Sequence, residues 1–434
     1  MEKGGSSVAN SKLVNASYKN GRGSTYCRGC EEKNLFSAID LGLLPIANEL
    51  WEYIKVDIDK FPLHLKICKI CGLGQVADVV TPERIFKDYR YLSSTSSTFL
   101  EHAETFVKEC IKEIRFSKKD WVLEIASNDG YLLKNFITHG VTAIGVEPAE
   151  NVAEIARGIG INTITDFFGS QLALKLYSMY GFPKLIIANN VMAHVPDLND
   201  FIKGLSILCG PNTRVSIENP SLANILLDMQ FDTIYHEHYS YLSATSVSIL
   251  SAKHGLTLMR IEELATHGGS NRYWLGRVGG SIPANDVRVT KFIQWEKSVG
   301  LFDESKWLNY AQKVKDLLSA FEFWLGERKN GDGRVVGYGA AAKASTLLNS
   351  ISSHNQVIHA IADASLEKQG RYMPPNSIKI ISPLEIPNYK PTDIVIFPWN
   401  IAAEIAEYLQ ISLGIQARLW SVIPEMREIK NHEL

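Results

Sequence analysis

A short segment near the middle of this 434-residue chain concentrates side chains that can move protons. Tyr235-His-Glu-His-Tyr239 places two imidazoles, a carboxylate and two phenols side by side. An imidazole exchanges protons near neutral pH, a carboxylate can orient it, and phenols donate hydrogen bonds. A further histidine, His194, follows a predicted strand in Asn190-Val-Met-Ala-His-Val-Pro-Asp197. Any one of these histidines alone would more often be structural, but the joint placement of the three favours an acid–base site.

Four of the six cysteines form two pairs, Cys27-Arg-Gly-Cys30 and Cys68-Lys-Ile-Cys71. A two-residue spacer lets both sulfurs of a pair bind one metal ion, and two pairs complete a tetrahedral zinc shell. Because such a shell has no open position, we expect a structural zinc. The alternative is that the four cysteines bind no metal and are ordinary buried or redox-active residues. We expect His64 on the surface, and Cys110 and Cys209 in packing positions.

A loop with the features of a cofactor site follows the predicted strand Trp121–Ile125. It reads Glu124-Ile-Ala-Ser-Asn-Asp-Gly130, opens a predicted helix from Tyr131 to His139, and lacks the GxGxxG spacing of dinucleotide enzymes. The loop resembles the first motif of class I methyltransferases, which bind S-adenosylmethionine (SAM), with Ala126 where glycine is usual.

Polar residues after the following strands occur in the order that this fold requires. Glu147 ends the second predicted strand, Val141–Val146, where an acidic side chain accepts hydrogen bonds from a ribose. Asp166-Phe167 follows the third strand, where the fold caps an adenine, and Asn189 closes the fourth. The alternative is a generic α/β turn with incidental carboxylates. The SAM site that we predict comprises Glu124, Asn128, Gly130, Glu147, Asp166, Phe167 and Asn189.

The elements that would position these residues alternate between strand and helix, which implies a parallel sheet with right-handed crossovers. A long amphipathic helix from about Asp303 to Leu325 is expected to bridge two domains. A second α/β unit follows it. The further predicted elements are strands at Leu185–Ala188, Arg214–Ile217, Arg334–Gly337, Ile358–Ala362 and Asp393–Phe397 and a helix at Leu198–Leu208.

The composition is that of a globular protein, with 45% hydrophobic and 21% charged residues. Lys and Arg total 45 against 47 Asp and Glu, so the chain has no overall basic excess for nucleic-acid binding. No apolar run approaches the ~20 residues that span a bilayer, and no signal peptide is evident. We expect a cytoplasmic monomer without nucleic-acid or membrane partners.

Taken together, these motifs resemble the sugar C-methyltransferases of deoxysugar biosynthesis. Members of that family transfer a methyl group from SAM to carbon 3 of a 4-keto-deoxyhexose that is linked to a nucleoside diphosphate. The resemblance covers nearly the whole chain in the same order. It rests on the two cysteine pairs, Glu124–Gly130, Asn190–Asp197, Phe231–His238 and Gly337–Lys343.

The resemblance implies an α/β protein with three domains. These are a zinc-binding module (residues 1–80), a doubly wound class I methyltransferase domain (81–275) and a C-terminal Rossmann-like domain (276–434). The substrate would lie between the last two. The active-site positions that the resemblance implies are Tyr89, His194, Tyr235, Glu237 and His238.

Within that site we expect His238 to remove the C3 proton, because a neutral imidazole is ready to accept it. Tyr235 and His194 would donate hydrogen bonds to the developing enolate oxygen, and Glu237 would orient a ring or a sugar hydroxyl. His236 alternates with His238 and is excluded, because in an extended segment it points to the opposite face. The alternative is that His238 only binds substrate while Tyr235 or a water is the base.

The C-terminal loop Gly337-Tyr-Gly-Ala-Ala-Ala-Lys343 is expected to hold the substrate diphosphate through Gly337, Gly339 and Lys343. A plain strand-to-helix turn is the alternative. The nucleotide is expected to be dTDP, with GDP and CDP open. Three other functions are a methyltransferase acting on a non-sugar ketone, a nicotinamide-dependent oxidoreductase that uses this loop, and a zinc adaptor without enzymatic activity.

Overall fold

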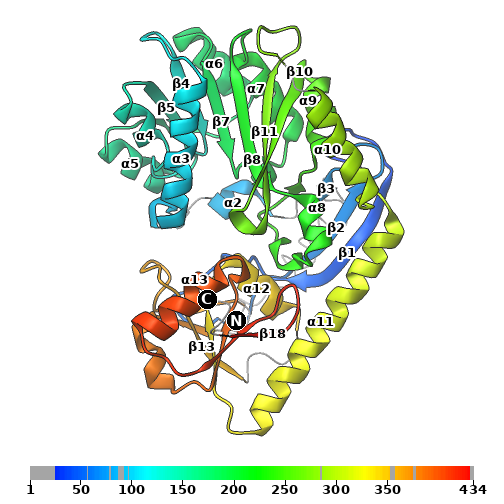
Figure 1. Cartoon of the computed structure of the whole chain (residues 1–434), viewed down its shortest axis with the longest axis vertical. Coiled ribbons are helices and arrows are strands. Elements are labelled where there is room, and N and C mark those ends of the chain that lie inside the picture. The colour runs from blue at the N-terminus through cyan, green and yellow to red at the C-terminus, as the bar shows by residue number, and fades with distance from the viewer. Residues whose placement is uncertain are drawn as a thin grey trace, which may run out of the picture.

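The computed structural model describes residues 25–55, 57–77, 80–86, 92–95, 97–283, 286–351, 357–374 and 378–430. A central seven-stranded sheet and a C-terminal sheet form the two large units of the chain (Figure 1). A smaller N-terminal sheet lies against both. Within the described part of the chain, no helix is long and apolar enough to cross a membrane.

The central sheet has the strand order β10-β11-β8-β7-β4-β5-β6. Its order reverses between β4 and β7, which creates the switch point where ligands of open α/β sheets bind. Strand β11 is antiparallel to both of its neighbours. The strands are β4 (Trp121–Ile125), β5 (Thr142–Val146), β6 (Asn162–Ile164), β7 (Leu185–Asn189), β8 (Arg214–Pro220), β10 (Leu256–Leu264) and β11 (Ser270–Arg277).

Helices cover both faces of this sheet, so β4 is buried along its whole length. One apolar cluster joins the sheet to α3 (Ser97–Glu113), α4 (Leu133–Thr138) and α5 (Glu150–Gly158). A second cluster, on the opposite face, joins it to another set of helices. These are α6 (Ser170–Tyr180), α7 (Leu198–Leu208), α9 (Ala244–Lys253) and α10 (Asp286–Ser298).

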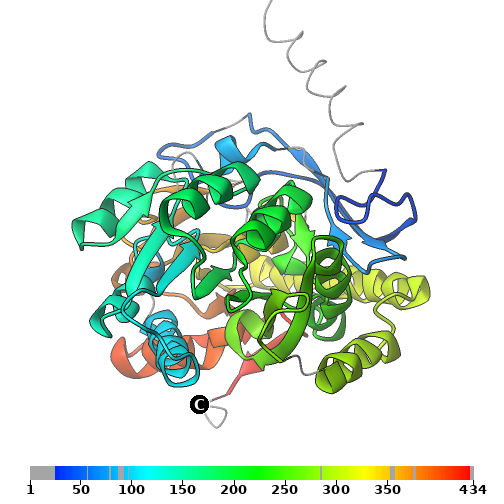
Figure 2. The ribbon, with the colours of Figure 1, turned by 90° about the horizontal axis from the view of Figure 1, so that it is seen from above.

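The N-terminal sheet contains β1 (Leu35–Leu44), β2 (Phe61–Cys68), β3 (Gly74–Gln75) and β9 (Ser240–Tyr241). Strand β9 comes from the middle of the chain, directly after the Tyr-His-Glu-His segment. The sequence analysis did not anticipate a sheet in this region. The sequence did carry a signal: Phe61, Leu63, Leu65 and Ile67 are apolar at every second position, and the strand buries all four of them. Figure 2 shows the blue strands of this module along the rim of the molecule.

The C-terminal sheet has the order β14-β15-β13-β12-β16-β17-β18, with antiparallel pairs only at its two edges. Its switch point lies at β12, which pairs with β13 on one side and with β16 on the other. The strands are β12 (Val335–Tyr338), β13 (Ile358–Ala362), β14 (Tyr372–Met373), β15 (Ile378–Ile381), β16 (Asp393–Ile396), β17 (Arg418–Ser421) and β18 (Arg427–Ile429).

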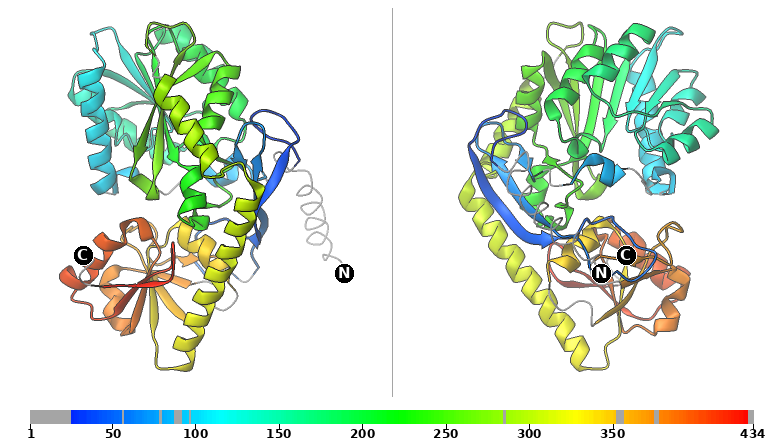
Figure 3. Two further views of the ribbon diagram at one scale, coloured as in Figure 1. Left: turned by 45° about the vertical axis from the view of Figure 1, so that its right-hand side comes forward. Right: turned by 180° about the vertical axis from the view of Figure 1, so that it is seen from behind.

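Helix α11 (Glu304–Asn330) connects the two large units and runs along one side of both (Figure 3). Its buried face, which includes Trp307, Val314 and Phe321, belongs to the same apolar cluster as residues of β1, β2 and the C-terminal sheet. The expected bridging helix is therefore confirmed. The apolar periodicity ends at Leu325, and the helix continues to Asn330, where the turn sequence Asn330-Gly-Asp-Gly333 predicts its end.

Candidate active site and metal centre

The four cysteines of the N-terminal module lie close together. The Sγ atoms of Cys27 and Cys71 are 3.5 Å apart, as are those of Cys30 and Cys68. All four sulfurs lie within 4.8 Å of one another. Thiolates bound at ~2.3 Å to one tetrahedral ion lie ~3.8 Å apart, so this donor set fits zinc. His64 lies outside the cluster and hydrogen-bonds Ser37 at 2.8 Å.

The predicted cofactor loop adopts a backbone that side chains disfavour. Ala126, Asn128 and Gly130 have φ angles of 55°, 49° and 80°. Glycine is usual at the position of Ala126 because it adopts such angles without strain. At Gly130 a Cβ would lie 2.8 Å from the side chain of Ile161. The loop therefore bends sharply at the end of β4.

Glu147 lies at the end of β5 and meets this loop. Its Oε2 accepts a hydrogen bond from the Asn128 N–H at 3.0 Å, and its Oε1 accepts one from Ala149 at 2.9 Å. Burial raises the pKa of the Glu147 carboxyl, and these two N–H groups partly oppose that shift. The structure thus brings together two residues that the sequence analysis assigned to one site, Asn128 and Glu147.

Two other predicted cofactor residues carry buried acceptors at the same edge of the sheet. Among the described residues, Glu124 Oε2 and Asn189 Oδ1 have no hydrogen-bond partner. Burial, and secondarily the charge of Asp129, raises the pKa of Glu124. Buried polar atoms in proteins are nearly always hydrogen-bonded, so these two fit contact with a bound polar ligand. At the end of β6, the ring of Phe167 is 47% exposed and available for stacking.

A segment outside the predicted site covers the loop. The backbone N–H of Ser93 donates to Asn128 Oδ1 at 2.9 Å, and that of Ser94 donates to Asp129 Oδ2 at 3.2 Å. These serines end the stretch Tyr89-Arg-Tyr-Leu-Ser-Ser94, which shares in the family resemblance, but the sequence analysis assigned them no role because only the fold brings them to the loop. Tyr89, which the resemblance places in the active site, lies outside the described residues.

In the Tyr-His-Glu-His segment, the Tyr235 hydroxyl lies 2.9 Å from Nε2 of His238. Nδ1 of His238 lies 3.2 Å from the carbonyl oxygen of Thr233, which can only accept a hydrogen bond. Nδ1 therefore carries the proton, and Nε2 accepts from Tyr235. Burial holds the pKa of His238 well below its ordinary value, and His194 adds to the shift. The imidazole is neutral, as its expected role requires.

His194 packs edge-on against His238, with ring centroids 4.6 Å apart. Its Nδ1 donates to the carbonyl oxygen of Glu237 at 2.7 Å. Burial lowers the pKa of His194 to about 4. The structure therefore gathers three of the expected catalytic side chains, from Tyr235, His238 and His194, into one cluster around the buried His238.

The Glu237 carboxylate is directed to the N-terminal module. Its Oε1 accepts hydrogen bonds from the backbone N–H of Asn48 at 3.0 Å and from the Asn48 side-chain amide at 3.1 Å. His236 also turns to the module, where its Nε2 donates to the Phe61 carbonyl at 3.2 Å. His236 is thus absent from the cluster, as expected. The segment is a turn rather than an extended strand, closed by a 3.0 Å hydrogen bond from the His238 N–H to the Tyr235 carbonyl oxygen. This turn is what directs His236 away from His238.

The C-terminal unit contacts the same segment from the other side. Lys343 Nζ donates to Asn400 Oδ1 at 2.8 Å and lies 4.1 Å from the centre of the Trp399 ring. Trp399 Nε1 in turn donates to Asp232 Oδ2 at 2.9 Å. Burial lowers the pKa of Lys343, and Asp232 opposes that shift. Sequence reasoning missed both Asp232 and Trp399, which lie 167 residues apart in the chain.

Packing is sufficient to explain the two glycines of the C-terminal loop. A Cβ on Gly339, where φ is +90°, would lie 2.3 Å from Pro398, and one on Gly337 would lie 2.7 Å from Phe397. At the end of β13, Asp363 stands where a nicotinamide enzyme places its ribose-binding acid. Its Oδ2 already accepts from Ala340 N at 2.8 Å and Lys368 Nζ at 3.2 Å. A ribose of the oxidoreductase alternative would have to share the carboxylate with these two donors.

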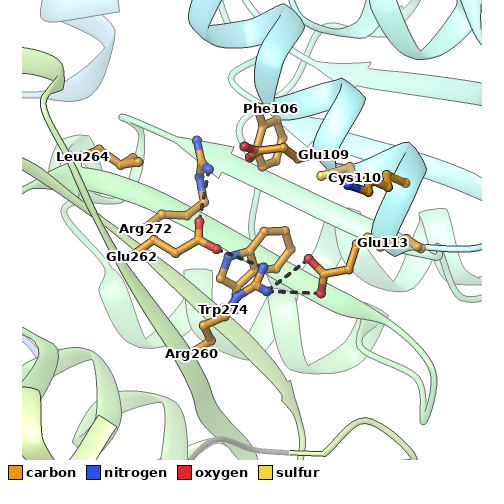
Figure 4. Close-up of a pocket in the computed structure, with 11 residues that line it drawn as sticks. Phe106, Glu109, Cys110, Glu113, Arg260, Glu262, Leu264, Arg272 and Trp274 are labelled. Atoms are coloured by element: carbon orange, nitrogen blue, oxygen red, sulfur yellow. Dashed lines mark hydrogen bonds and ion pairs between the residues drawn. The ribbon is translucent and has the colours of Figure 1, made fainter. Parts of the chain in front are cut away.

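A pocket of about 560 Å³ lies elsewhere, between α3 and strands β10 and β11 (Figure 4). Its charged side chains pair with one another: Arg260 with Glu113 at 3.0 Å and Arg272 with Glu262 at 3.2 Å. None of the predicted site residues lines it.

Comparison with known families divides the chain into three parts. Residues 27–86 match a family model described as "Putative zinc binding domain". Residues 99–261 match "Methyltransferase domain", and residues 265–424 match "C-methyltransferase C-terminal domain".

C-methyltransferase NovU of Streptomyces niveus is 30% identical to this chain over 408 residues, which cover 93% of this chain and 96% of NovU. Among solved structures, magnesium protoporphyrin IX methyltransferase of Synechocystis PCC 6803 is 13% identical, with a TM-score of 0.32, over 45% of this chain and 92% of its own. The PH0226 protein of Pyrococcus horikoshii OT3 is 15% identical, with a TM-score of 0.34, over 45% and 97%.

The sheet order, the antiparallel β11 and the family match of residues 99–261 define a class I, SAM-dependent methyltransferase domain. The cysteine cluster and the match of residues 27–86 define a zinc-binding module beside it. With its similarity to NovU over nearly the full length of both proteins, the chain belongs to the C-methyltransferase family.

Proposed function

We propose that this C-methyltransferase adds a methyl group to C3 of a 4-keto-deoxyhexose linked to a nucleoside diphosphate. The observation that carries the proposal is the partly buried Tyr235–His238 pair, with its 2.9 Å hydrogen bond. The pair lies where the zinc module, the methyltransferase domain and the C-terminal domain meet. Methylation of carbon requires a carbon nucleophile, and a neutral base beside a proton donor is the arrangement that generates one.

The chemistry follows from the acidity of the substrate. A C4 keto group acidifies the C3–H bond, so a base can remove that proton while the electrons of the bond delocalise onto the C4 oxygen. When SAM is bound, it supplies the electrophilic methyl group that C3 then accepts. Residues at the ends of β4 to β7 would hold it, Glu147 through the ribose and Phe167 through the adenine.

We assign the final position of the C3 proton to Nε2 of His238. The Tyr235 hydroxyl donates to that atom, so the pair acts as one unit: the proton reaches Nε2 directly, or through the phenol as Tyr235 passes its own proton on. Tyr235 is the donor to the enolate oxygen. His194 gives its Nδ1 proton to the Glu237 carbonyl, so its neutral ring offers Nε2 only as an acceptor. Glu237 Oε2, which has no partner among the residues that the structure describes, binds a sugar hydroxyl. Tyr89 keeps the active-site role that the resemblance gives it.

On the C-terminal side, Lys343 holds the substrate diphosphate, with the loop at Gly337 and Gly339 beside it. Its Nζ lies above Trp399 and within hydrogen-bond distance of Asn400, so it is already oriented. Burial also favours a bound anion, because an anion compensates the desolvated ammonium group. We favour dTDP as the nucleotide, with GDP and CDP open, and a cytoplasmic monomer with domains at 1–80, 81–275 and 276–434.

The experiment that tests this function uses SAM with an isotope-labelled methyl group and a panel of dTDP-, GDP- and CDP-linked 4-ketosugars. The expected result is incorporation of the label at C3, with the carbon identified by NMR of the product. Label on oxygen or nitrogen, or on no member of the panel, would reject the proposal while leaving the family membership intact.

A further inference from the structure

The N-terminal module contacts the catalytic segment directly. Of the five consecutive positions from Tyr235 to Tyr239, three bind the module and two face the active-site cluster. Glu237 binds Asn48, His236 binds the Phe61 carbonyl at 3.2 Å, and the Tyr239 hydroxyl donates to the Val80 carbonyl at 2.7 Å. Tyr235 and His238 face each other. Strand β9 then continues the module's own sheet by pairing with β3.

The loop that carries Asn48 also reaches the C-terminal domain. Three residues further on, Trp51 exchanges two backbone hydrogen bonds with Tyr372, at 3.1 and 2.8 Å. The neighbouring Glu52 pairs with Arg371 at 3.3 Å. A single loop of the module thus holds the catalytic segment at one point and the C-terminal domain at another, which fixes Asn48 relative to both.

Both donors of Asn48 converge on one oxygen of Glu237. The backbone N–H lies 3.0 Å and the side-chain Nδ2 3.1 Å from Oε1. The Glu237 side chain is buried, whereas Asn48 is exposed. With Oε1 saturated, the carboxylate is fixed in rotation and its other oxygen, Oε2, is left as the acceptor for a ligand.

We propose that Asn48 is a positioning residue of the active site, which holds the Glu237 carboxylate so that Oε2 accepts a hydrogen bond from a substrate hydroxyl. Glu237 contacts the substrate and Asn48 does not. The zinc module is then a wall of the substrate site, and its loop links the site's two halves. The assignment of Oε2 to a sugar hydroxyl rests on the proposed function, but the assignment of Asn48 to Glu237 does not.

The protonation of Glu237 gives a readout that general stabilisation would not move. Burial raises the pKa of Glu237, whereas the two hydrogen bonds from Asn48 lower it by favouring the carboxylate. The other ionisable groups acting on it are Glu49 of the same loop, which raises the pKa, and Tyr241 of β9, which is neutral at physiological pH. His194 contacts the Glu237 backbone carbonyl rather than its carboxylate. Removing the Asn48 amide must therefore raise the pKa of Glu237.

Asn48→Ala in the full-length, zinc-loaded chain tests the proposal. We expect kcat/KM for the sugar nucleotide to fall about tenfold to a hundredfold, with the acidic limb of its pH profile moved to higher pH. The dissociation constant for SAM, the zinc content and the melting temperature should stay at wild-type values. Asn48→Gln keeps an amide and should recover part of the loss, whereas Asn48→Asp should lose more than Asn48→Ala, because it places a second carboxylate beside Glu237.

The matched control is His64→Ala, a half-buried residue of the same module whose partners are Ser37 and Asp40 of β1. NMR of protein labelled at its glutamate carboxyl carbons, with the Glu237 signal assigned from Glu237→Gln, follows the pKa without any substrate. An unchanged Glu237 pKa in Asn48→Ala overturns the assignment even if no ketosugar is a substrate. Equal losses in Asn48→Ala and His64→Ala, or loss of zinc from Asn48→Ala, also overturn it.

Discussion

The Tyr235 hydroxyl donates a hydrogen bond to Nε2 of His238, 2.9 Å away, while the other ring nitrogen of His238 is held by the Thr233 carbonyl. The phenol therefore occupies the lone pair that is needed to accept the substrate proton. Either it relays the proton, or it swings toward the enolate oxygen as His238 accepts the proton itself.

Tyr235→Phe separates these two routes. If the phenol relays the proton, exchange of the C3 hydrogen with deuterated water should fall by about a hundredfold or more, because the chain then lacks its proton carrier. If Tyr235 only stabilises the enolate, we expect a smaller loss, of about tenfold. Tyr177→Phe, an exposed tyrosine of α6, is the control. Exchange at the wild-type rate in Tyr235→Phe would remove Tyr235 from the site.

The pH dependence of this exchange reports the state of His238. Burial lowers the pKa of His238, and a lowered pKa favours the neutral imidazole. As the pH falls through 6.5, an ordinary histidine gains a proton and stops acting as a base, whereas His238 should remain neutral. We therefore expect no loss of exchange at about 6.5. The variant Glu237→Gln removes the titration of the nearby carboxylate from the pH profile of exchange. An inflection near pH 6.5 that persists in this variant would contradict the assignment of His238 as a neutral base.

Glu147→Ala tests the cofactor site. Loss of a charge-assisted hydrogen bond to the ribose, worth about 1.5–3 kcal/mol, should raise the dissociation constant for SAM by about tenfold to a hundredfold. Titration calorimetry measures this directly. Glu150→Ala is a suitable control because that residue is exposed and pairs with Arg157 on the same helix. Unchanged affinity in a folded Glu147→Ala variant would exclude Glu147 from the site.

The cysteine cluster predicts one zinc ion per chain. Cys71→Ser should lose the metal and lower the free energy of unfolding by about 4 kcal/mol or more, because Cys71 is buried in the core that the module shares with the methyltransferase domain. Elemental analysis and thermal unfolding measure the two effects. His64→Ala should keep its zinc. A wild-type chain purified without chelator that contains well under one zinc would contradict the prediction.

Local sequence patterns predicted much of the fold. The predicted strands Trp121–Ile125 and Ile358–Ala362 and the helix Leu198–Leu208 have the observed bounds. In each, a mostly apolar run or a three- and four-residue period decides the structure locally. The residues of the Tyr-His-Glu-His segment and Glu147 could likewise be picked out, because chemistry-bearing side chains stood at strand ends or close together.

The missed residues depend on contacts between distant parts of the chain. Asn48 reaches Glu237 across 189 residues, and Trp399 reaches Asp232 across 167. Neither asparagine nor tryptophan is unusual where it stands in the sequence. Only the joining of β9 to the module's sheet and the packing of the C-terminal domain bring these pairs together. Similarly, Asp363 follows β13 as a ribose-binding acid would, but only the structure shows it engaged by Ala340 and Lys368.

Lys343→Ala tests the diphosphate assignment. Removal of the ammonium group should raise KM for the sugar nucleotide about tenfold and leave the affinity for SAM unchanged, since a charged hydrogen bond is lost at the diphosphate alone. Steady-state kinetics with both substrates measures the two effects. Lys379→Ala, a lysine at an outward-facing position of β15, is the control. An unchanged KM for the sugar nucleotide would show that Lys343 does not bind the diphosphate.

Deuterium exchange at C3 of the ketosugar nucleotide, without methyl donor, tests the central claim most directly because it isolates proton removal. In deuterated water the wild-type chain should incorporate deuterium at C3. His238→Ala should lose this exchange together with methyl transfer, by about a hundredfold or more, while its affinity for SAM stays unchanged. Exchange at the wild-type rate in His238→Ala would contradict the account and place the base elsewhere in the site, with Tyr235 the next residue to test.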